Sequence, residues 1–412
     1  MQYRIGDLLF ALISLVLVQP AWCQEKTGVD NLLERKPNQP VDTKILYWGE
    51  KPNRPLEAVL NRFVDNSEIA GAVALVADKE GVIAGQAVGL ADIANKQALT
   101  RDSIFWIASM SKPVTGACVM MLQDEGKLSL DDPITKYLPE MKDLKLAGTP
   151  AVITIRQLLS HTSGMAELQQ EEAYTSRDLT EAAARYAKVK ILFTPGTKWQ
   201  YSQTSINTAG RIVEVVSGLS LDVFIEKRLC EPLGMKDTGF YLSTPQAERL
   251  AKSYRKNEEG RLEEAKISLL AGHLPTDRER MPAANGGLFS TADDYAKFCR
   301  MLLRDGELDG KRILSAEAVK TMRTIVTGNL VTGFTPGNGW GIGCCVIREP
   351  QGVSETLASG SFGHGGAYGT QAWIDPTNER IYILMTQRAN FPNSDASDLR
   401  REFQQAARKL TR

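Results

Sequence analysis

Histidine is scarce in this sequence, and the few residues present are not arranged as metal ligands. Only three of the 412 residues are histidines, namely His161, His273 and His364, and they stand far apart in the chain. Metal sites in proteins need several ligands at characteristic spacings. We therefore expect no metal site and no other cofactor.

An excess of charge of either sign is also missing. The 49 lysines and arginines balance the 49 aspartates and glutamates, and no long run of one sign occurs. Proteins that bind nucleic acid or a membrane surface by electrostatic attraction carry clustered basic residues. Internal repeats and low-complexity segments are absent as well. We expect a small molecule as the partner, and no nucleic acid.

Cysteines are too few and too apolar in their surroundings to form a disulfide framework. Cleavage after Cys23 would leave five of the six, most of them inside apolar helix or strand patterns. Such cysteines usually pack in a core. The adjacent pair Cys344 and Cys345 would point to opposite faces of a strand.

The apolar stretch at the N-terminus is too short to span a bilayer. Arg4 precedes the mostly apolar residues 8–18, and Ala21 stands where signal peptidase could cut, which predicts an export signal. A retained membrane anchor is the weaker alternative, and lipid attachment at Cys23 is disfavoured by the bulky Trp22 before it. We expect an exported protein, periplasmic or secreted, with no stable membrane span once the signal is cleaved.

Composition and periodicity divide the chain into four segments. We expect the signal at 1–23, an exposed arm at 24–55, one folded domain at 56–390 and a closing helix at 391–412.

Strand patterns at both ends of the domain enclose a long helical section. A hairpin pattern opens the domain, and helical patterns occupy about 120–280. Strand patterns return near residue 285, and strands are expected over 341–348, 370–374 and 381–385. We expect an α+β fold with one antiparallel sheet built from about 65–105 and 285–390. Helices flank this sheet, 120–280 forms an inserted helical region, and the active site lies in the cleft between them. The closing helix is expected to pack on the sheet.

Ser109 and Lys112 form a Ser-x-x-Lys pattern at the predicted start of an amphipathic helix. A lysine three residues after a serine lies on the same helical face. It can accept the hydroxyl proton if burial lowers its pKa. A serine at a helix N-terminus also has backbone N–H groups nearby that stabilise developing negative charge. Pro113 fits this placement only if the first turn is irregular.

By itself this pattern is weak evidence for a catalytic site. The same spacing recurs at Ser253 and Lys256, in a polar stretch without apolar flanks. Other residues must therefore support the assignment.

Two further segments carry candidate residues. Tyr201 lies in a loop before a predicted helix, with Gln203 two residues later, and a tyrosine near a lysine can relay a proton. A tyrosine simply packed at a helix start is an equally good interpretation. His364, Gly365 and Gly366 precede a predicted strand, where glycines allow close approach of a substrate and backbone N–H groups can bind an oxyanion. An ordinary glycine-rich turn is the alternative.

In this order the three segments resemble the serine β-lactamase and penicillin-binding superfamily, specifically the group of class C β-lactamases, DD-peptidases and family VIII carboxylesterases. The resemblance covers roughly residues 55–390. Members carry Ser-x-x-Lys, then Tyr-x-Asn, then a Lys-Thr-Gly or His-x-Gly strand. Four more stretches are similar to ones that recur in this group, at 126–133, 158–164, 232–235 and 286–291.

The resemblance implies a β-lactamase/transpeptidase-like fold and a role for each matching residue. Ser109 would be the nucleophile, Lys112 the general base and Tyr201 the group that protonates the leaving group. The backbone N–H groups of Ser109 and Ala367 would bind the oxyanion. His161 matches a recurring loop to which the resemblance assigns no catalytic role, and we expect a helix-end or loop histidine there.

Two departures from the family pattern bear on the substrate. Gln203 replaces the usual asparagine, so the amide that contacts the acyl side chain would lie one methylene further out. His364 and Gly365 replace the lysine and threonine of most β-lactamases. A histidine is mostly neutral at pH 7, so an anionic β-lactam should be recognised less well, although some DD-peptidases also carry histidine here.

These expectations lead to an exported serine hydrolase that forms an acyl-enzyme and hydrolyses small carboxylic esters. A β-lactamase or D-Ala-D-Ala carboxypeptidase acting on amides or β-lactams is the second hypothesis. A non-catalytic penicillin-binding or scaffold protein is the third.

Overall fold

The computed structural model describes residues 46–49, 54–169, 172–391 and 394–410. Every described residue belongs to one compact unit, Asp42–Arg412, which is called the second unit below. The expected export signal and most of the expected arm lie outside the described residues. The described part of that arm differs from expectation, because Leu46–Gly49 forms strand β1 and pairs with β3.

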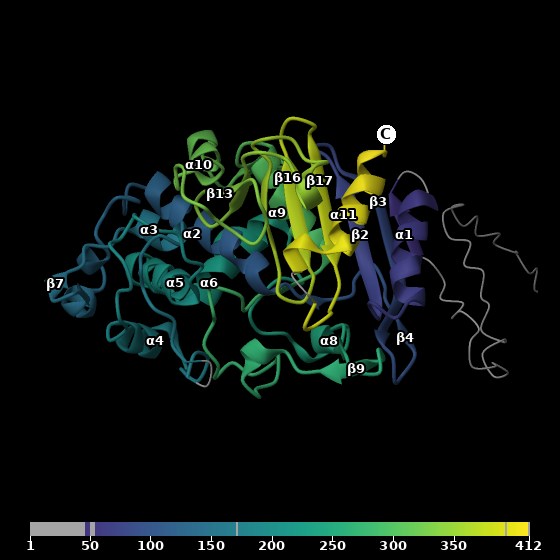
Figure 1. The fold of residues 1–412 in the computed structure, drawn as a ribbon, viewed down its shortest axis with the longest axis horizontal. Helices are drawn as coiled ribbons and strands as arrows, with labels where there is room; N and C mark the ends of the chain where they lie inside the picture. The colour runs from purple at the N-terminus through teal and green to yellow at the C-terminus, as the bar shows by residue number, and fades with distance from the viewer. Residues whose placement is uncertain (1–45, 50–53, 170–171, 392–393, 411–412) are drawn as a thin grey trace, which may run out of the picture. The chain divides into compact units, whose positions relative to one another are not determined.

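One antiparallel sheet joins the two ends of the second unit, as the strand patterns predicted. Among the described residues it has nine strands, eight in the order β1-β3-β2-β17-β16-β15-β14-β13, with β4 paired to β3. Figure 1 shows the early strand β2 lying close to the late strands β16 and β17. The strands are β1 Leu46–Gly49, β2 Gly71–Ala77, β3 Val82–Asp92, β4 Gln97–Ala98, β13 Asn338–Trp340, β14 Cys345–Ile347, β15 Phe362–Gly365, β16 Gln371–Asp375 and β17 Arg380–Met385.

Strand β2 is apolar at every position because both faces of the sheet are covered. All of its residues are buried. Ala72 and Val76 belong to the core on one face, and Val73 and Leu75 to the core on the other. Successive side chains of a strand point to opposite faces, so a strand covered on both sides has no polar alternation.

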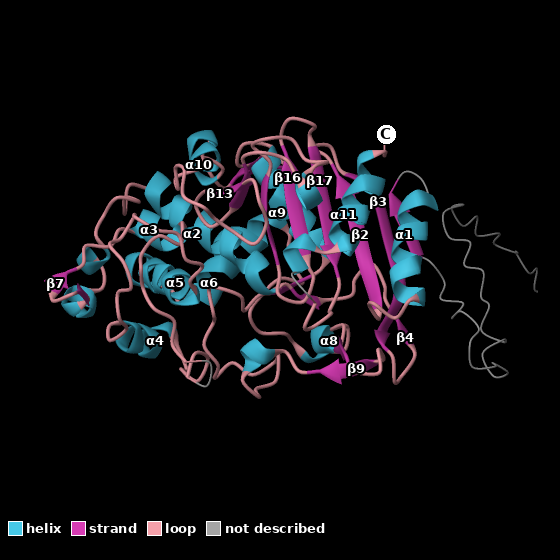
Figure 2. Ribbon diagram, in the orientation of Figure 1, coloured by secondary structure: helices cyan, strands magenta, loops and turns pink. Residues whose placement is uncertain are grey.

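Helices cover the two faces of the sheet. Leu60 of α1 and Phe403 of α11 pack in the core on one face, whereas Phe298 and Met301 of α9 pack on the other (Figure 2). Helix α11 lies within the segment where the closing helix was expected, and it contacts α1 and β17. The helices are α1 Arg54–Asp65, α2 Ser111–Asp124, α3 Ile155–Leu159, α4 Leu179–Tyr186, α5 Gln203–Ser217, α6 Leu221–Ile225, α7 Glu231–Leu233, α8 Thr244–Ala247, α9 Ala292–Leu303, α10 Ala316–Met322 and α11 Asp398–Arg408.

The predicted helical insertion corresponds to the region from α3 to α8. Within it, α5 packs against α2, α3, α4 and α6, and in Figure 1 these helices gather away from α1 and α11. Short two-stranded ladders complete the unit. They pair β5 Phe105–Trp106 with β10 Phe289–Ser290, β6 Lys145–Leu146 with β7 Thr149–Pro150, β8 Ser253–Lys256 with β9 Leu262–Ala265, and β11 Glu307–Leu308 with β12 Lys311–Arg312.

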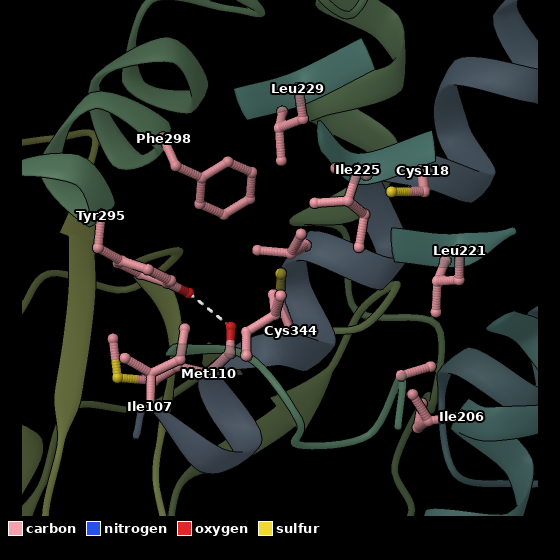
Figure 3. Packing of buried hydrophobic residues seen from close by; sticks show 14 of the residues in the cluster. Ile107, Met110, Cys118, Ile206, Leu221, Ile225, Leu229, Tyr295, Phe298 and Cys344 are labelled. Carbon is pink, nitrogen blue, oxygen red and sulfur yellow. Dashed lines mark hydrogen bonds between the residues drawn. The ribbon is translucent and has the colours of Figure 1, made fainter. Parts of the chain in front are cut away.

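The start of α2 is fixed by the apolar core beneath it. The Tyr295 hydroxyl donates a hydrogen bond of 2.8 Å to the carbonyl of Met110, the residue that precedes α2. Figure 3 shows this bond among packed residues of α2, α6 and α9, including Cys118, Ile225 and Phe298. The first turn is irregular, as Pro113 required, because a short 3-10 helix, η1 Ala108–Met110, precedes α2.

One local prediction was only partly right. The strand expected over 341–348 is present only at Cys345–Ile347, which is β14, and residues 341–344 connect β14 to β13. Gly343 adopts φ of +70°, and a side chain there would meet the backbone of Lys112 and Gly116, whereas one at Gly341 would meet the carbonyl of Met322. Close packing on α2 and α10 therefore explains the two glycines. The second Ser-x-x-Lys lies on strand β8, where residues three apart point to opposite faces. Ser253 is buried and donates to Gln387, whereas Lys256 pairs with Glu68.

The described cysteines are all buried and unpaired. Cys344 belongs to the core on one face of the sheet and Cys345 to the core on the other, which confirms their opposite orientation. Over the described ranges, no helix combines the length and the apolar character that crossing a membrane requires.

Candidate active site

Ser109 lies in η1, directly before α2, and is partly exposed. The preceding Ala108 has φ of +46°, a left-handed conformation that is uncommon for a residue other than glycine. The Ser111 hydroxyl holds this turn, since it donates to the Ala108 carbonyl at 2.7 Å and accepts the Leu288 N–H at 3.1 Å. A strained turn held in this way is typical of functional sites.

Lys112 lies one helical turn after Ser109 and is fully buried. Its Nζ is 3.0 Å from Ser109 Oγ, 2.9 Å from Gln203 Oε1 and 2.7 Å from the carbonyl oxygen of Asn285. The amide and carbonyl oxygens can only accept hydrogen bonds. A neutral amine satisfies them with its two N–H groups, and its lone pair then faces the Ser109 hydroxyl.

The surroundings of Lys112 favour this neutral form. Burial lowers the pKa of Lys112 well below its ordinary value of 10.5, while the more distant charges of Glu167 and Asp395 act in the opposite direction. Burial removes water from the charged ammonium and so favours the neutral amine. This lowering of the Lys112 pKa is larger than the rise caused by the two carboxylates. The predicted burial of Lys112 is thus confirmed.

Tyr201 is placed against this pair by the loop that precedes α5. Ser202 caps α5, since its hydroxyl accepts the Ser205 N–H at 3.1 Å. The Tyr201 ring lies with its centre 4.6 Å from Lys112 Nζ, and its hydroxyl is 3.3 Å from His364 Nε2. Burial raises the pKa of Tyr201 well above 10, and a hydrogen bond with Ser109 partly opposes that rise. The phenol is therefore protonated in the resting site.

His364 is neutral, and its tautomer follows from its contacts. Nδ1 lies 2.6 Å from the carbonyl oxygen of Gly365, which only accepts, so Nδ1 carries the proton. Nε2 is then the acceptor for the Tyr201 hydroxyl. Burial, helped by the charge of Lys112, lowers the pKa of His364 to about 3.

Strand β15 brings its glycines against the nucleophile turn. β15 pairs with β14 only as far as Gly363, while His364 and Gly365 pair with β16 alone. The strand predicted near His364 therefore lies inside the sheet, but its last two residues have a neighbouring strand on one side only. A turn begins at Gly366. A side chain at Gly366 would meet the carbonyl of Ile107, so only glycine permits this approach.

Two backbone N–H groups remain available beside Ser109. Within the described part of the chain, neither the Ser109 N–H nor the Ala367 N–H donates to another protein group. The Ala367 residue is exposed in the turn after β15. Both expected oxyanion donors can therefore donate to a substrate oxygen.

Sequence reasoning missed Asn285 and Glu167, which complete the network. Asn285 Nδ2 donates to Gln203 Oε1 at 2.8 Å and to the Tyr174 hydroxyl at 3.1 Å. The Glu167 carboxylate accepts the N–H groups of Gln203 and Thr204, at 2.7 and 3.2 Å, at the start of α5. The only sequence feature that could have pointed to Asn285 is its position just before the 286–291 stretch. No sequence feature pointed to Glu167.

A pocket of about 200 Å³ lies beside Gln203. Its walls include Leu168, Tyr174 and Tyr186, with Glu167 at one side. Because Gln203 Oε1 already accepts from Lys112 and Asn285, the amide Nε2 is the part of Gln203 that can donate to a substrate.

The structure brings the sequence candidates together at one place. Ser109, Lys112, Tyr201, Gln203 and His364 are linked by the contacts above, and Gly365 to Ala367 follow on β15 and its turn. His161 is a helix-end histidine, as expected, but it is buried against Tyr201. His273 is remote and pairs with Asp277. Among the described residues, no group of three histidine, cysteine or acidic side chains is placed to hold a metal ion.

An antiparallel sheet beside a helical region, with Ser-x-x-Lys at the start of the helix that links them, defines a serine hydrolase of β-lactamase/transpeptidase-like fold. The β-lactamase family model matches residues 56–407, and the chain belongs to this family.

Known relatives include hydrolases. The chain is 34% identical to Protein Rv1367c of Mycobacterium tuberculosis, over 83% of this chain and 91% of that protein. It is 28% identical to Esterase EstB of Burkholderia gladioli, over 81% and 90%. The solved structure of EstCE1, a hydrolase with promiscuous acyltransferase activity, matches with a TM-score of 0.75 at 25% identity, covering 86% of this chain and 97% of that one.

Proposed function

We propose that this protein is an exported serine hydrolase that forms an acyl-enzyme on Ser109 and hydrolyses small, uncharged carboxylic esters. The contacts of Lys112 support the first step. Its lone pair takes the Ser109 proton while its two N–H groups stay bonded to Gln203 and Asn285. Oγ of Ser109 then bonds to the ester carbonyl carbon.

The next steps use the groups around Ser109. Negative charge on the carbonyl oxygen accepts hydrogen bonds from the Ser109 and Ala367 N–H groups. Tyr201 gives its proton to the leaving alkoxide, and the ammonium then present on Lys112 stabilises the phenolate across 4.6 Å from the ring centre. Water then attacks the acyl carbon and gives a proton to the Tyr201 phenolate. As the bond from the acyl carbon to Ser109 Oγ breaks, the Lys112 ammonium returns its proton to Oγ, and the carboxylic acid leaves with Tyr201 and Lys112 in their resting states.

The neutral state of His364 is the observation that carries the substrate class. A lysine at this place would offer a permanent cation to a substrate carboxylate, whereas the pKa of His364 is lowered to about 3. The carboxylates of Glu167 and Asp395 are the other charges that act on Lys112. The Arg400 guanidinium lines the same cavity as His364, but its charge interacts with the Asp395 carboxylate. A charged substrate group would therefore be desolvated here without an unpaired opposite charge. An uncharged ester avoids that penalty.

Apolar surface next to Tyr201 supports an apolar leaving group. Phe334 is 44% exposed, and its ring meets the Tyr201 ring edge to face at 4.9 Å. Because Tyr201 protonates the leaving oxygen in this scheme, the alcohol part of an ester would lie against Phe334.

A matched pair of esters tests the substrate class. The acetyl ester of methyl meta-hydroxybenzoate and the acetyl ester of meta-hydroxybenzoate differ only in a leaving-group carboxylate. We expect kcat/KM to be at least about tenfold higher for the uncharged ester, because the anion is desolvated without a partner. The His364→Lys variant should narrow that ratio. A preference for the anionic ester in the unchanged protein would contradict the proposal.

Turnover of p-nitrophenyl acetate and of a chromogenic cephalosporin, measured side by side, separates the rival function. Rapid ester turnover with slow or absent cephalosporin turnover supports an esterase. A β-lactamase would turn over the cephalosporin, and a penicillin-binding peptidase would give a stoichiometric burst that stalls. The Ser109→Ala variant is the control for both substrates.

A further inference from the structure

His161 contacts the backbone on both sides of Tyr201. Its carbonyl oxygen accepts the N–H of Gln200 at 2.9 Å, and its Nδ1 accepts the N–H of Ser202 at 3.1 Å. The residues before and after Tyr201 are therefore both bonded to one histidine, 40 positions earlier in the chain. These two bonds restrict rotation of the peptide groups that flank Tyr201.

The imidazole ring also supports the phenol directly. The ring centres of His161 and Tyr201 lie 4.4 Å apart with a tilt of 38°. The imidazole also meets the Trp340 ring edge to face at 5.0 Å, and the Trp340 ring itself lies 5.9 Å from the Tyr201 ring. His161 is 0% exposed, so its ring is packed against both of these aromatic side chains.

The protonation state of His161 is consistent with these contacts. Nδ1 accepts a hydrogen bond, so the proton of the neutral ring is on Nε2. Burial, together with the charge of Lys112, lowers the pKa of His161 well below 6.5. The ring thus stays an acceptor toward Ser202 through the neutral range.

The backbone of His161 adopts a conformation that is unfavourable for a residue with a side chain. His161 follows α3 and its cap Ser160 with φ of +60°. This left-handed position after a helix is the one that favours glycine. Histidine there is strained relative to glycine, and strain of this kind accompanies a function of the side chain.

We propose that His161 is a positioning residue that orients Tyr201 for proton transfer, through its two backbone hydrogen bonds and its stacked ring. The inference rests on the proposed function, since it assumes that Tyr201 protonates the leaving group. His161 itself touches neither Ser109 nor the reacting atoms in this scheme. Its effect on the reaction passes through Tyr201.

Two variants at His161 separate the hydrogen-bond acceptor from the backbone conformation. Both asparagine and glycine tolerate a positive φ. Asparagine can place its Oδ1 near the position of Nδ1 and accept the Ser202 N–H, whereas glycine offers no acceptor. His161→Asn and His161→Gly are therefore compared by kcat and KM on p-nitrophenyl acetate. Melting temperature and circular dichroism of each variant show whether it is folded.

We expect His161→Gly to lower kcat by about 10- to 100-fold, which is part of the roughly 10²- to 10⁴-fold that a positioned general acid contributes. KM should change little, because substrate contacts are unaffected. His161→Asn should recover most of kcat. Equal losses in both folded variants, or a fall in KM and kcat together, would overturn the inference. If the glycine variant does not fold, His161→Asn decides: near-normal kcat supports the inference, and a loss beyond about tenfold overturns it.

A double-mutant cycle shows whether the effect passes through Tyr201. We expect His161→Gly to have no further effect on kcat in a Tyr201→Phe background, because the positioned hydroxyl is already gone. A loss in that background equal to the loss in the unchanged protein would overturn the inference. Normal activity of Tyr201→Phe alone would instead contradict the proposed role of Tyr201, and the inference would fall with it.

Discussion

Nζ of Lys112 lies 3.0 Å from Oγ of Ser109, and its other two hydrogen-bond partners are oxygens that only accept. This relationship fixes where the lone pair of a neutral Lys112 points. The burial that lowers its pKa makes that neutral form available. Acylation of Ser109 in this account depends on both conditions.

Lys112→Met should remove the base and keep the volume of the side chain. We expect kcat/KM for p-nitrophenyl acetate to fall about 10³-fold, within the range that a general base contributes. The exposed Lys311 on β12 provides a matched control, and Lys311→Met should leave the rate unchanged. Retention of normal activity in Lys112→Met would exclude Lys112 as the base.

The same variant should change how stability depends on pH. The unfolded chain holds a proton on Lys112 up to about pH 10.5, whereas the folded chain has lost it at lower pH. Stability of the unchanged protein therefore rises with pH across that window, by up to about 1.4 kcal/mol per pH unit from this group. Urea denaturation of Lys112→Met should show a shallower rise above neutral pH. An identical slope would mean that Lys112 is charged in the folded protein.

His364 should make the protein sensitive to acid. Its pKa is about 3 in the folded chain against 6.5 ordinarily, so its contribution to stability is complete above pH 6.5 and is lost as pH falls toward about 3. We expect His364→Asn to reduce the slope of unfolding free energy in that window by up to about 1.4 kcal/mol per pH unit. Equal slopes for His364→Asn and the unchanged protein would contradict the buried neutral state.

Phe334→Ala should weaken selection for apolar alcohols. We expect kcat/KM for phenyl acetate to fall about 3- to 10-fold, as loss of an aromatic contact implies, with little change for methyl acetate. Val152, which is 70% exposed on the hairpin region before α3, provides a control variant, Val152→Ala. Parallel losses on both esters would place the leaving group elsewhere.

Tyr295→Phe should destabilise the protein more than it slows the reaction. It removes the hydroxyl that donates to the Met110 carbonyl at the start of α2. Leaving a buried carbonyl without its donor costs about 1–3 kcal/mol, which urea denaturation can detect. The partly exposed hydroxyl of Tyr241, bonded to the Arg280 carbonyl, gives a milder comparison in Tyr241→Phe. An unchanged midpoint for Tyr295→Phe would show that this bond adds no net stability.

Local patterns predicted most of the architecture because burial follows periodicity. The hairpin of β2 and β3 and the closing helix α11 each carry a regular apolar pattern. Helix α2 differs from the amphipathic expectation, because every residue from Ser111 to Leu122 is buried. The segment 341–348 misled the same reasoning. Gly343 packs closely on α2 and Gly341 on the carbonyl of Met322 in α10, and a contact between distant segments leaves no periodic signal.

The sequence predicted those site residues that belong to a motif. It did not predict residues that reach the site only through the folding of distant segments. Ser109, Lys112 and Tyr201 stood in recognisable patterns, and the structure brings them together. Asn285 contributes a backbone carbonyl to Lys112, which any residue type could do. His161 approaches Tyr201 only because the end of α3 packs beside the loop before α5.

The most direct test of the account is the mass of the protein during turnover. p-Nitrophenyl acetate is mixed with the protein, the reaction is stopped in acid within the burst, and peptides are analysed by mass spectrometry. We predict one acetyl group on the peptide that carries Ser109, absent from Ser109→Ala. Turnover without an adduct on Ser109, or equal turnover by Ser109→Ala, would contradict the acyl-enzyme on which the proposed function rests.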